Sequence, residues 1–461
     1  MKEIDEHLRS DHLFLLVGTN PLPNWVAAKL LLNPGGRVHL FYTAGTKEQA
    51  VRLRKVLQDR EKIAVSDYGT EESNEGRIYA DVKKQAELLR DNSKGRIGLN
   101  YTGGTKMMAV HAHRAMFSVP NDRLALSYLD ARSLKFKFDF RSDEPDATVQ
   151  ITIQTLLELH DEFRNFAQDV SHEQTAKCEK AASCLVQMHR DDSGQNVWRN
   201  WCDGLMVKDG KDRRGRDRWR KIGEVYTEKW KKEDKRKYDQ AVIDLNGKPL
   251  MKVDDFSQMV ESSLVDVGLT AREVALNLVP VADGYQKMLD ALKISGGDTL
   301  ETTTRNNPEF ADSVDLAKWL DGLWLEHYAI SQIQSRASAT GIDPKCTAIN
   351  LVSLNKSDRR FEADVIALRG YQLFYFSCYS GSAPETSKRK LFEAVTRAIQ
   401  LGGDEAKAAL ICNHDSPKLL RQEYEADWEL ASHNRVRIFG RRHLPVLADE
   451  LKDWFEGKPE K

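Results

Sequence analysis

The sequence predicts a mixed α/β protein with at least two domains. Short apolar runs rich in β-branched and aromatic residues alternate with segments of helical apolar spacing through residues 1–155. The same alternation returns at 313–461, and a chain of 461 residues exceeds what one hydrophobic core usually serves. Strand patterns are scarce between these regions, so we expect a mainly helical insertion at 156–312.

Composition excludes several classes of function. The net charge of −1 indicates no general affinity for nucleic acid or membranes. The six cysteines are scattered without a CxxC pair, so neither a zinc framework nor a disulfide framework is expected. The polar start is unlike a signal peptide, and no apolar run approaches the roughly 20 residues that span a bilayer. We therefore expect a cytoplasmic protein.

The N-terminal region alternates strands and helices. Strands are predicted at His12–Val17, Arg37–Thr43, Lys62–Tyr68, Arg96–Thr102, Leu124–Leu129 and Leu134–Phe140. Helices are predicted at Trp25–Leu32, Lys47–Arg60, Arg77–Arg90 and Met107–Phe117. This βαβα order predicts a parallel sheet covered by helices, as in Rossmann-like folds.

The other two regions are expected to differ from each other. In the middle region, helices are predicted at Thr175–Met188 and Ala271–Ile294, and the polar segment 295–312 is predicted to be a linker. In the C-terminal region, strands are predicted at Thr347–Ser353, Ala363–Leu368, Gln372–Cys378, Ala408–Cys412 and Arg435–Phe439. Helices are expected there at Val314–Ile333, Lys388–Gln400 and Leu444–Trp454.

A glycine loop joins the fourth strand to its helix in the stretch LNYTGGTKMM. Its candidate ligand-binding residues are Thr102, Gly103, Gly104, Thr105 and Lys106. Unpaired N–H groups at a helix start, the helix dipole and the lysine charge would together favour a phosphate-rich ligand. The spacing matches neither a Walker A loop nor GxGxxG. The alternative is an ordinary strand–helix turn with Thr105 as its N-cap.

Two further loops follow predicted strand ends. VGTNPLP supplies Thr19, Asn20 and Pro21, and FYTAGT supplies Thr43 and Thr46. The carboxyl ends of parallel strands meet at one edge of a sheet. These loops would therefore form a polar rim wider than one mononucleotide requires.

The N-terminal region resembles the CRISPR-associated Rossmann fold (CARF) domain over roughly residues 10–155. The resemblance is carried by the stretches VGTNPLP, FYTAGT and NYTGGTKMM. The resemblance implies a sensor of the cyclic oligoadenylates made by type III CRISPR complexes. It implies a homodimer with one ring across the twofold axis, held by Thr102–Lys106 and Thr19–Pro21. Cyclic tetra-adenylate is the expected activator, with cyclic hexa-adenylate left open.

Three carboxylates stand out in the C-terminal region. Asp364 begins an otherwise apolar strand, Glu362 shares its face, and Glu326 lies among Leu323, Trp324 and Leu325. A carboxylate in such surroundings is costly unless it is paired or binds a metal ion. A divalent ion held there could activate water against a phosphodiester. The alternatives are a solvated Glu362 and a Glu326 paired with a nearby lysine or arginine.

The C-terminal region resembles a PD-(D/E)xK nuclease core over about 313–455. Three stretches carry the resemblance: LDGLWLEHY, RFEADVIALRGYQLFYFSC and SKRKLFEAVTRAIQLGG. It implies a restriction-endonuclease-like fold and a metal-dependent endonuclease acting on DNA or RNA. Glu326, Asp364 and the Cys378 carbonyl would hold Mg²⁺ or Mn²⁺. Where the family carries an acid and a lysine, this chain has Ser377-Cys378-Tyr379. Lys388 or Lys390 could replace that lysine, unless both are simply solvated.

The middle region contains a basic stretch. Between positions 208 and 237, fourteen Lys and Arg face seven Asp and Glu, with Trp219, Tyr226 and Trp230 interspersed. Basic and aromatic residues can bind a nucleic-acid strand. A solvated insertion is an equal interpretation.

Three functional hypotheses follow. The first is a cyclic-oligoadenylate-activated, metal-dependent nuclease of type III CRISPR antiviral defence. The second is a non-catalytic sensor of the same ligand with a degenerate nuclease domain. The third, weaker hypothesis is a nucleotide-binding regulator unrelated to CRISPR.

Overall fold

The computed structural model describes residues 4–71, 74–92, 95–120, 124–160, 175–204, 206–211, 217–221, 235–354, 360–428 and 435–459. The chain divides into two units that are each dense in internal contacts. The first unit comprises Met1–His172, Gly341–Tyr375 and Glu393–Ala408. The second unit comprises Glu173–Thr340, Phe376–Phe392 and Ala409–Lys461.

A six-stranded sheet organises the N-terminal part of the first unit. Its order is β3-β2-β1-β4-β5-β6. The strands are β1 (Ser10–Leu16), β2 (Leu32–Tyr42), β3 (Ala64–Gly69), β4 (Ile97–Asn100), β5 (Leu124–Asp130) and β6 (Lys135–Phe138). The first five strands pair in parallel, and β6 pairs antiparallel with β5. The predicted parallel, Rossmann-like sheet is therefore confirmed.

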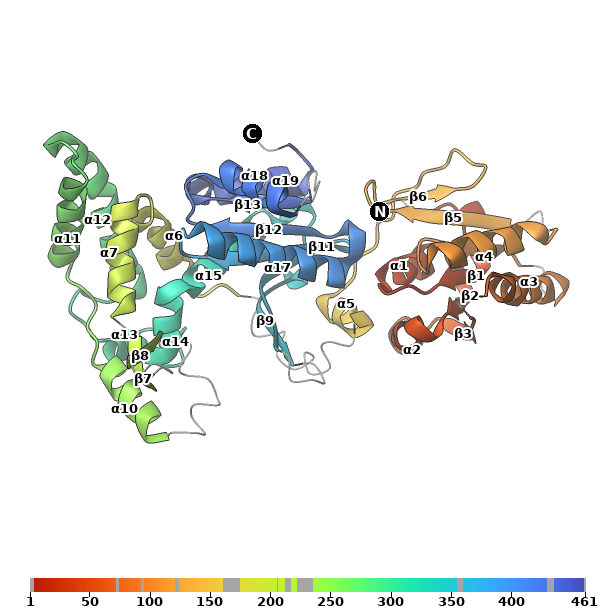
Figure 1. Ribbon diagram of the computed structural model, residues 1–461, viewed down its shortest axis with the longest axis horizontal. Helices are drawn as coiled ribbons and strands as arrows, with labels where there is room; N and C mark the ends of the chain where they lie inside the picture. The colour runs from red at the N-terminus through yellow and green to blue at the C-terminus, as the bar shows by residue number, and fades with distance from the viewer. Residues whose placement is uncertain are drawn as a thin grey trace. The chain divides into compact units, whose positions relative to one another are not determined.

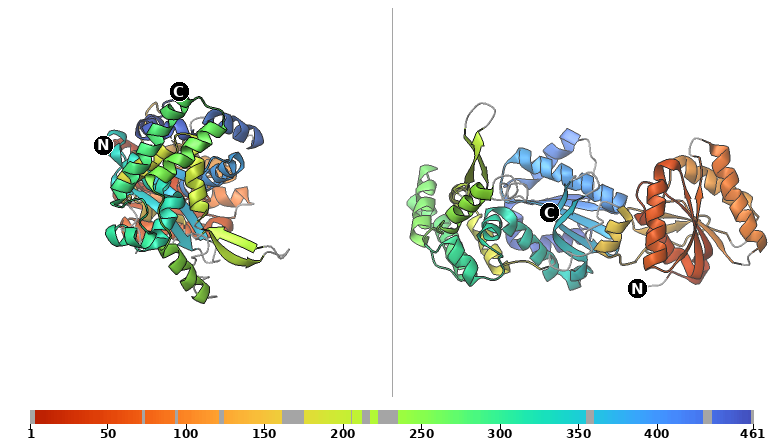
Figure 2. Two further views of the ribbon diagram at one scale, coloured as in Figure 1. Left: turned by 90° about the vertical axis from the view of Figure 1, so that its left-hand side faces the viewer. Right: turned by 90° about the horizontal axis from the view of Figure 1, so that it is seen from below.

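Helices cover both faces of this sheet (Figure 2, right). They are α1 (Leu22–Leu31), α2 (Lys47–Lys55), α3 (Glu75–Asn92) and α4 (Lys106–Ser118). Phe14, Leu16, Phe41 and Leu99 from the strands pack with Met108 of α4 in one buried cluster. Burial of such apolar side chains is the main favourable contribution to the folding of a sheet covered by helices.

The order in which the strands are added to the sheet reverses at β1. β1 lies between β2 and β4, so the chain leaves β1 toward one edge of the sheet and returns on its other side. In open α/β sheets, ligands bind beyond the carboxyl ends of the strands at such a switch point. The loops after β1 and β4 lie at this position.

The second sheet has five strands in the order β13-β12-β11-β10-β9. They are β9 (Thr347–Leu354), β10 (Arg360–Arg369), β11 (Gln372–Tyr379), β12 (Lys407–Cys412) and β13 (Val436–Phe439). β10 pairs antiparallel with β9, with Ala363 opposite Leu351. α17 (Pro384–Gly402) connects β11 to β12, and α18 (Pro417–Trp428) connects β12 to β13, before α19 (Leu447–Phe455) ends the domain. Helical crossovers between neighbouring strands are typical of parallel pairs.

Helices dominate the remainder of the second unit, and α11 and α12 lie side by side in Figure 1. The helices after the first sheet are α5 (Ile153–His160, first unit), α6 (Glu179–Met188), α7 (Asp192–Asp203), α10 (Lys235–Asn246), α11 (Val253–Asp266), α12 (Ala271–Leu292), α13 (Leu300–Asn306), α14 (Ser313–Lys318), α15 (Trp324–Ser335) and α16 (Ala337–Thr340). None of the helices in the described ranges has the length and apolarity to cross a bilayer.

Three sequence-based expectations need correction here. The expected linker 295–312 contains the short helix α13, whose Leu300 and Thr303 are fully buried. The expected helix Val314–Ile333 is interrupted by a π-helical turn, Trp319–Leu323. Part of the basic stretch forms an antiparallel strand pair, β7 (Met206–Lys211) and β8 (Asp217–Lys221). Residues 222–234 of that stretch lie outside the described residues.

Candidate functional site

The loops after β1 and β4 are in direct backbone contact. A Cβ atom on Gly18 would lie 2.9 Å from the backbone nitrogen of Gly104, closer than real Cβ atoms come. A Cβ on Gly103 would overlap the carbonyl oxygen of Leu16, and Gly104 has a φ of +78°. The glycines are therefore needed for the close approach of the two loops and for one left-handed backbone conformation.

Thr105 and Thr102 each have a structural role in the TGGTK loop. The Oγ1 atom of Thr105 accepts a hydrogen bond from the Met108 N–H at 3.3 Å, which makes Thr105 the N-cap of α4. The Oγ1 atom of Thr102 accepts from the Leu129 N–H at 2.7 Å. The Thr102 hydroxyl proton is not used in that bond. Lys106, the first residue of α4, is exposed.

The VGTNPLP loop begins α1. Asn20 Oδ1 accepts a hydrogen bond from the Leu22 N–H at 2.9 Å, while Pro21 is buried and Thr19 is exposed. The Nδ2 atom of Asn20 is buried and has no hydrogen-bond partner in the part of the chain that the structure describes. It lies so close to Gly403 that a Cβ there would overlap it. Gly403 follows α17, so the first unit brings this loop against the α17–β12 turn.

The FYTAGT loop is held by its own threonines. Thr43 N–H donates to Thr46 Oγ1 at 3.1 Å, and the two hydroxyl oxygens lie 3.4 Å apart. Both side chains are buried, and together they form a capping box before α2. Their polar atoms therefore stabilise the loop itself.

A polar cluster that the sequence did not reveal lies beside the TGGTK loop. Tyr101 Oη donates to Asp139 Oδ1 at 2.7 Å, and His113 Nε2 lies 2.6 Å from Asp139 Oδ2. Burial, and then the hydrogen bond to Asp139, raise the pKa of Tyr101, so it stays a protonated donor. Asp139 thus ties the residue before the loop to α4 and to the segment after β6.

One side of α4 carries exposed apolar residues. Met107, Val110 and Phe117 are 42%, 55% and 63% exposed, and Phe140, whose ring centroid is 5.9 Å from that of Phe117, is 85% exposed. Positions separated by three and seven residues fall on the same face of a helix. Helical spacing in the sequence could have revealed this stripe, but spacing alone predicts only an apolar face and not its exposure.

Glu326 lies on α15 in the second unit and is buried, with 8% of its surface exposed. The two preceding residues, Trp324 and Leu325, are fully buried. The predicted apolar surroundings of this carboxylate are therefore present.

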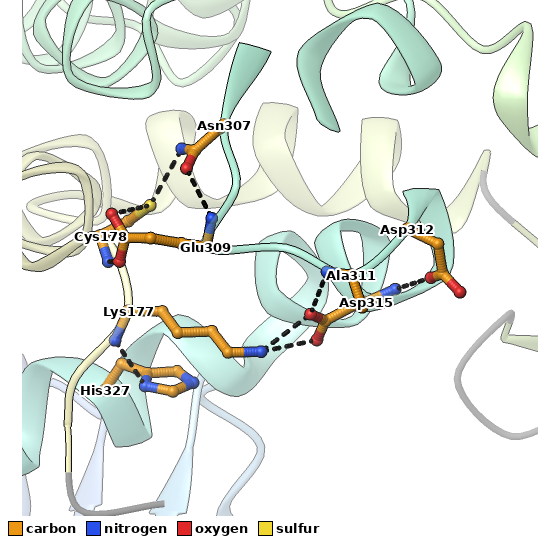
Figure 3. A network of polar contacts seen from close by, with 8 residues as sticks. All are labelled: Lys177, Cys178, Asn307, Glu309, Ala311, Asp312, Asp315 and His327. Carbon is orange, nitrogen blue, oxygen red and sulfur yellow. Dashed lines mark hydrogen bonds and ion pairs between the residues drawn. The ribbon is translucent and has the colours of Figure 1, made fainter. Parts of the chain in front are cut away.

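The residue after Glu326 belongs to a polar network that fixes α15 (Figure 3). His327 Nδ1 accepts a hydrogen bond from the Lys177 N–H at 3.0 Å, and Lys177 Nζ contacts both Asp315 oxygens at 3.0 and 2.8 Å. Burial lowers the pKa of His327 to about 4, which keeps the imidazole neutral and able to accept. The network sets the orientation of the helix that carries Glu326.

Glu362 and Asp364 lie on β10 in the first unit. Asp364 is half-buried between Ala363 and Val365, which are fully buried. The side chain of Glu362 lies outside the described residues. Ser377, Cys378 and Tyr379 end the neighbouring strand β11, and the side chains of Ser377 and Cys378 are buried.

Both candidate lysines lie in the first turns of α17. Lys388 Nζ forms an ion pair with Glu423 Oε2 of α18 at 2.9 Å. The sequence did not reveal this partner, because Glu423 lies 35 positions further along the chain. Lys390 is half-buried on the same helix.

A metal site is not apparent from the described side chains. They contain no group of three or more His, Cys, Asp or Glu residues arranged to hold a metal ion. The Glu362 side chain lies outside these described residues, and the metal requirement stays a prediction from the sequence resemblance.

No protein-family model matches the chain, and no curated protein matches its sequence significantly. Two solved structures share its fold over almost its whole length. The protein VC1899 from Vibrio cholerae aligns with a TM-score of 0.58 at 14% identity, covering 97% of this chain and 98% of that one. Can2 from Sulfobacillus thermosulfidooxidans, solved in complex with cyclic tetra-adenylate, aligns with a TM-score of 0.59 at 15% identity and the same coverages. This likeness confirms the fold implied by the resemblance to CARF-containing CRISPR proteins, while the PD-(D/E)xK assignment stays a prediction.

Proposed function

We propose that this chain is a nuclease of type III CRISPR defence that is switched on by a cyclic oligoadenylate. One observation carries the proposal: the Gly18 loop and the Gly103-Gly104 loop meet at the switch point of the parallel sheet, beside the start of α4. Can2, which shares the fold, was solved with cyclic tetra-adenylate, and this supports the class of ligand.

The rim offers donors that suit a phosphodiester ring. The first turn of α4 has N–H groups without helical partners, and the positive end of its dipole points the same way. Lys106 adds a charge, and the Thr102 hydroxyl proton adds a donor. Thr19 and Asn20 extend the rim along the neighbouring strand. Thr43 and Thr46 would act by shaping the third loop, because they bond to each other.

We propose that two copies pair through α4. Met107, Val110, Phe117 and Phe140 form the exposed apolar surface on and beside this helix. Contiguous exposed apolar surface usually marks an interaction site. A dimer formed there would place two TGGTK loops at a twofold axis, where a symmetric ring can contact both.

The nuclease reaction would use Glu326, Glu362 and Asp364, with Lys390 or Lys388 near the phosphodiester. In PD-(D/E)xK enzymes, which the sequence resembles, such carboxylates hold Mg²⁺ or Mn²⁺ together with a backbone carbonyl, here that of Cys378. Lys388 forms an ion pair with Glu423, and Lys388 and Lys390 both remain candidates for the lysine that contacts the substrate. A requirement for Mg²⁺ or Mn²⁺ is tested by removing metal with EDTA and restoring each ion singly.

A cleavage panel tests the function directly. Purified protein is mixed with supercoiled DNA, single-stranded DNA or RNA, each with no activator, cyclic tetra-adenylate or cyclic hexa-adenylate. We expect cleavage only in the presence of one ring. Cleavage independent of either ring would refute the gating.

A second candidate is a non-catalytic sensor of the same ligand. It is favoured by Ser377-Cys378-Tyr379, which lacks the family's acid and lysine, and by the engaged Lys388. Tight ring binding without cleavage of any substrate in the panel would support this second candidate.

A further inference from the structure

The second unit contains a hollow that none of the proposed sites uses. Its volume is about 800 Å³, within the range of roughly 300–1,000 Å³ that ligand sites occupy. α6 and its end, the middle of α12, and the turns after β12 and β13 line it. Arginines from two of these places, Arg190, Arg441 and Arg442, border it.

The acidic residues of the hollow are already paired. Asp283 Oδ2 lies 2.7 Å from Lys287 Nζ, and Asp415 Oδ1 lies 2.8 Å from Arg441 Nη1. The arginines divide into two kinds. Arg441 is buried and also bonds to Asp192, so its charge is compensated. Arg190 and Arg442 are exposed.

The charges of these two arginines are available to an anion. Arg442 donates only a long hydrogen bond, 3.4 Å, to the Asp415 carbonyl oxygen. Neither side chain is ion-paired within the described ranges of the chain. Guanidinium groups suit phosphate oxygens in both geometry and charge.

Apolar groups line the rest of the hollow. Val186, Val279, Pro280 and Pro445 contribute to its walls. Apolar surface next to cationic side chains fits a ligand that combines an aromatic ring with a phosphate. A nucleotide within a nucleic-acid strand has both parts, and such strands bind proteins through stacking and phosphate contacts.

Hydrogen bonds connect the hollow to the end of β11. Arg441 Nη2 donates to Gln195 Oε1 at 2.7 Å, and Gln195 Nε2 donates to the Ser380 carbonyl oxygen at 3.2 Å. Asn413 Nδ2 donates to the same oxygen at 2.7 Å. Ser380 directly follows Ser377-Cys378-Tyr379, so the hollow is fixed to the strand end that belongs to the candidate nuclease residues.

We propose that this hollow binds one nucleotide of the substrate strand outside the cleavage site, with its phosphate on Arg190 and Arg442 and its base against the apolar walls. The proposal rests on the proposed nuclease function for the identity of the strand, but strand binding can be measured without cleavage.

The test is the affinity of the full-length protein for a fluorescently labelled single-stranded oligonucleotide, as DNA and as RNA, by anisotropy in EDTA. It is run with and without cyclic tetra-adenylate. The variant is Arg190→Gln with Arg442→Gln. The control is Arg272→Gln with Arg305→Gln, which removes two exposed charges of the same unit outside the hollow.

We expect the hollow variant to raise the Kd about tenfold at low salt and the control to change it less than twofold. The slope of log Kd against log salt should fall by roughly 0.7 in the hollow variant, because one phosphate contact on a single strand contributes about 0.7. Equal losses in the two double variants, an unchanged Kd in the hollow variant, or no strand binding by the wild-type protein would each overturn the proposal.

The two proposals fail in different ways. If the strand binds through Arg190 and Arg442 but is never cleaved, the nuclease proposal fails and the hollow stands. If the strand is cleaved while the hollow variant keeps the wild-type Kd, the hollow fails and the nuclease stands.

Discussion

Replacing Gly18 by alanine would separate the two loops on which the ligand proposal depends. The new Cβ would lie 2.9 Å from the Gly104 backbone nitrogen, whereas ordinary contact begins near 3.4 Å. The loops must therefore move apart by about 0.5 Å. Overpacking against a fixed backbone typically costs about 1–3 kcal/mol of stability. Gly18 has no left-handed φ, so this contact alone is perturbed.

The same displacement should weaken ligand binding. A hydrogen bond to a charged group contributes about 1.5–3 kcal/mol, so losing one phosphate contact should raise the Kd for cyclic tetra-adenylate at least tenfold. Isothermal titration calorimetry measures the Kd, and urea unfolding measures stability. Gly45→Ala is the matched control, because a Cβ there would meet only Thr43 Oγ1, at 3.9 Å. If Gly18→Ala loses stability but keeps the wild-type Kd, the loops are only an ordinary strand–helix connection and the reasoning is refuted.

Three further predictions concern pairing, cleavage and pH. Phe117→Glu should convert the proposed dimer to a monomer in light scattering, while Val51→Glu, at another exposed apolar site on α2, should not. A dimer that survives Phe117→Glu contradicts the α4 interface. Asp364→Asn should abolish ring-dependent cleavage and leave the ring Kd within twofold; residual cleavage would exclude Asp364 from the reaction. Because burial lowers the pKa of His327 to about 4 from 6.5, the unfolded state binds the extra proton, so stability should fall as pH drops from 6.5 toward 4. His327→Asn should flatten the dependence of urea stability on pH by up to about 1.4 kcal/mol per unit, and an unchanged slope would contradict this.

The sequence predicted the two sheets well, because their strands and helices carry strong periodic patterns. The six strands of the first sheet lie within a few residues of their predicted positions. In the middle region, periodicity predicted α6 and α12 but did not reveal α13. The polar segment 295–312 contains α13, in which Leu300 and Thr303 are buried, and a threonine-rich pattern resembles a loop.

The candidate site was predictable only as a set of loops. Gly103 and Gly104 were predicted to contact a ligand, whereas the structure shows that Gly104 closely approaches Gly18 and Gly103 approaches Leu16. Local sequence does not specify which two loops touch, because that depends on strand order. The pairs Lys388–Glu423 and Tyr101–Asp139 join residues more than thirty positions apart and could not be found from spacing.

The proposed gating would set a quantitative demand on the rim. To move a dimer from 1% to 99% active, a ligand must bind the active state about 10⁴-fold more tightly, or about 5.5 kcal/mol. A ring shared by two rims would need about half of this from each copy, which is one or two charge-assisted hydrogen bonds that form only in the active state. Residues fixed in capping interactions, such as Thr43 and Thr46, contribute equally to both states and so cannot supply this difference. The residues that can supply this difference are Lys106, Thr102 and Asn20. Among the described contacts, the exposed Lys106 ammonium, the Thr102 hydroxyl proton and the buried Asn20 amide nitrogen are not used as donors.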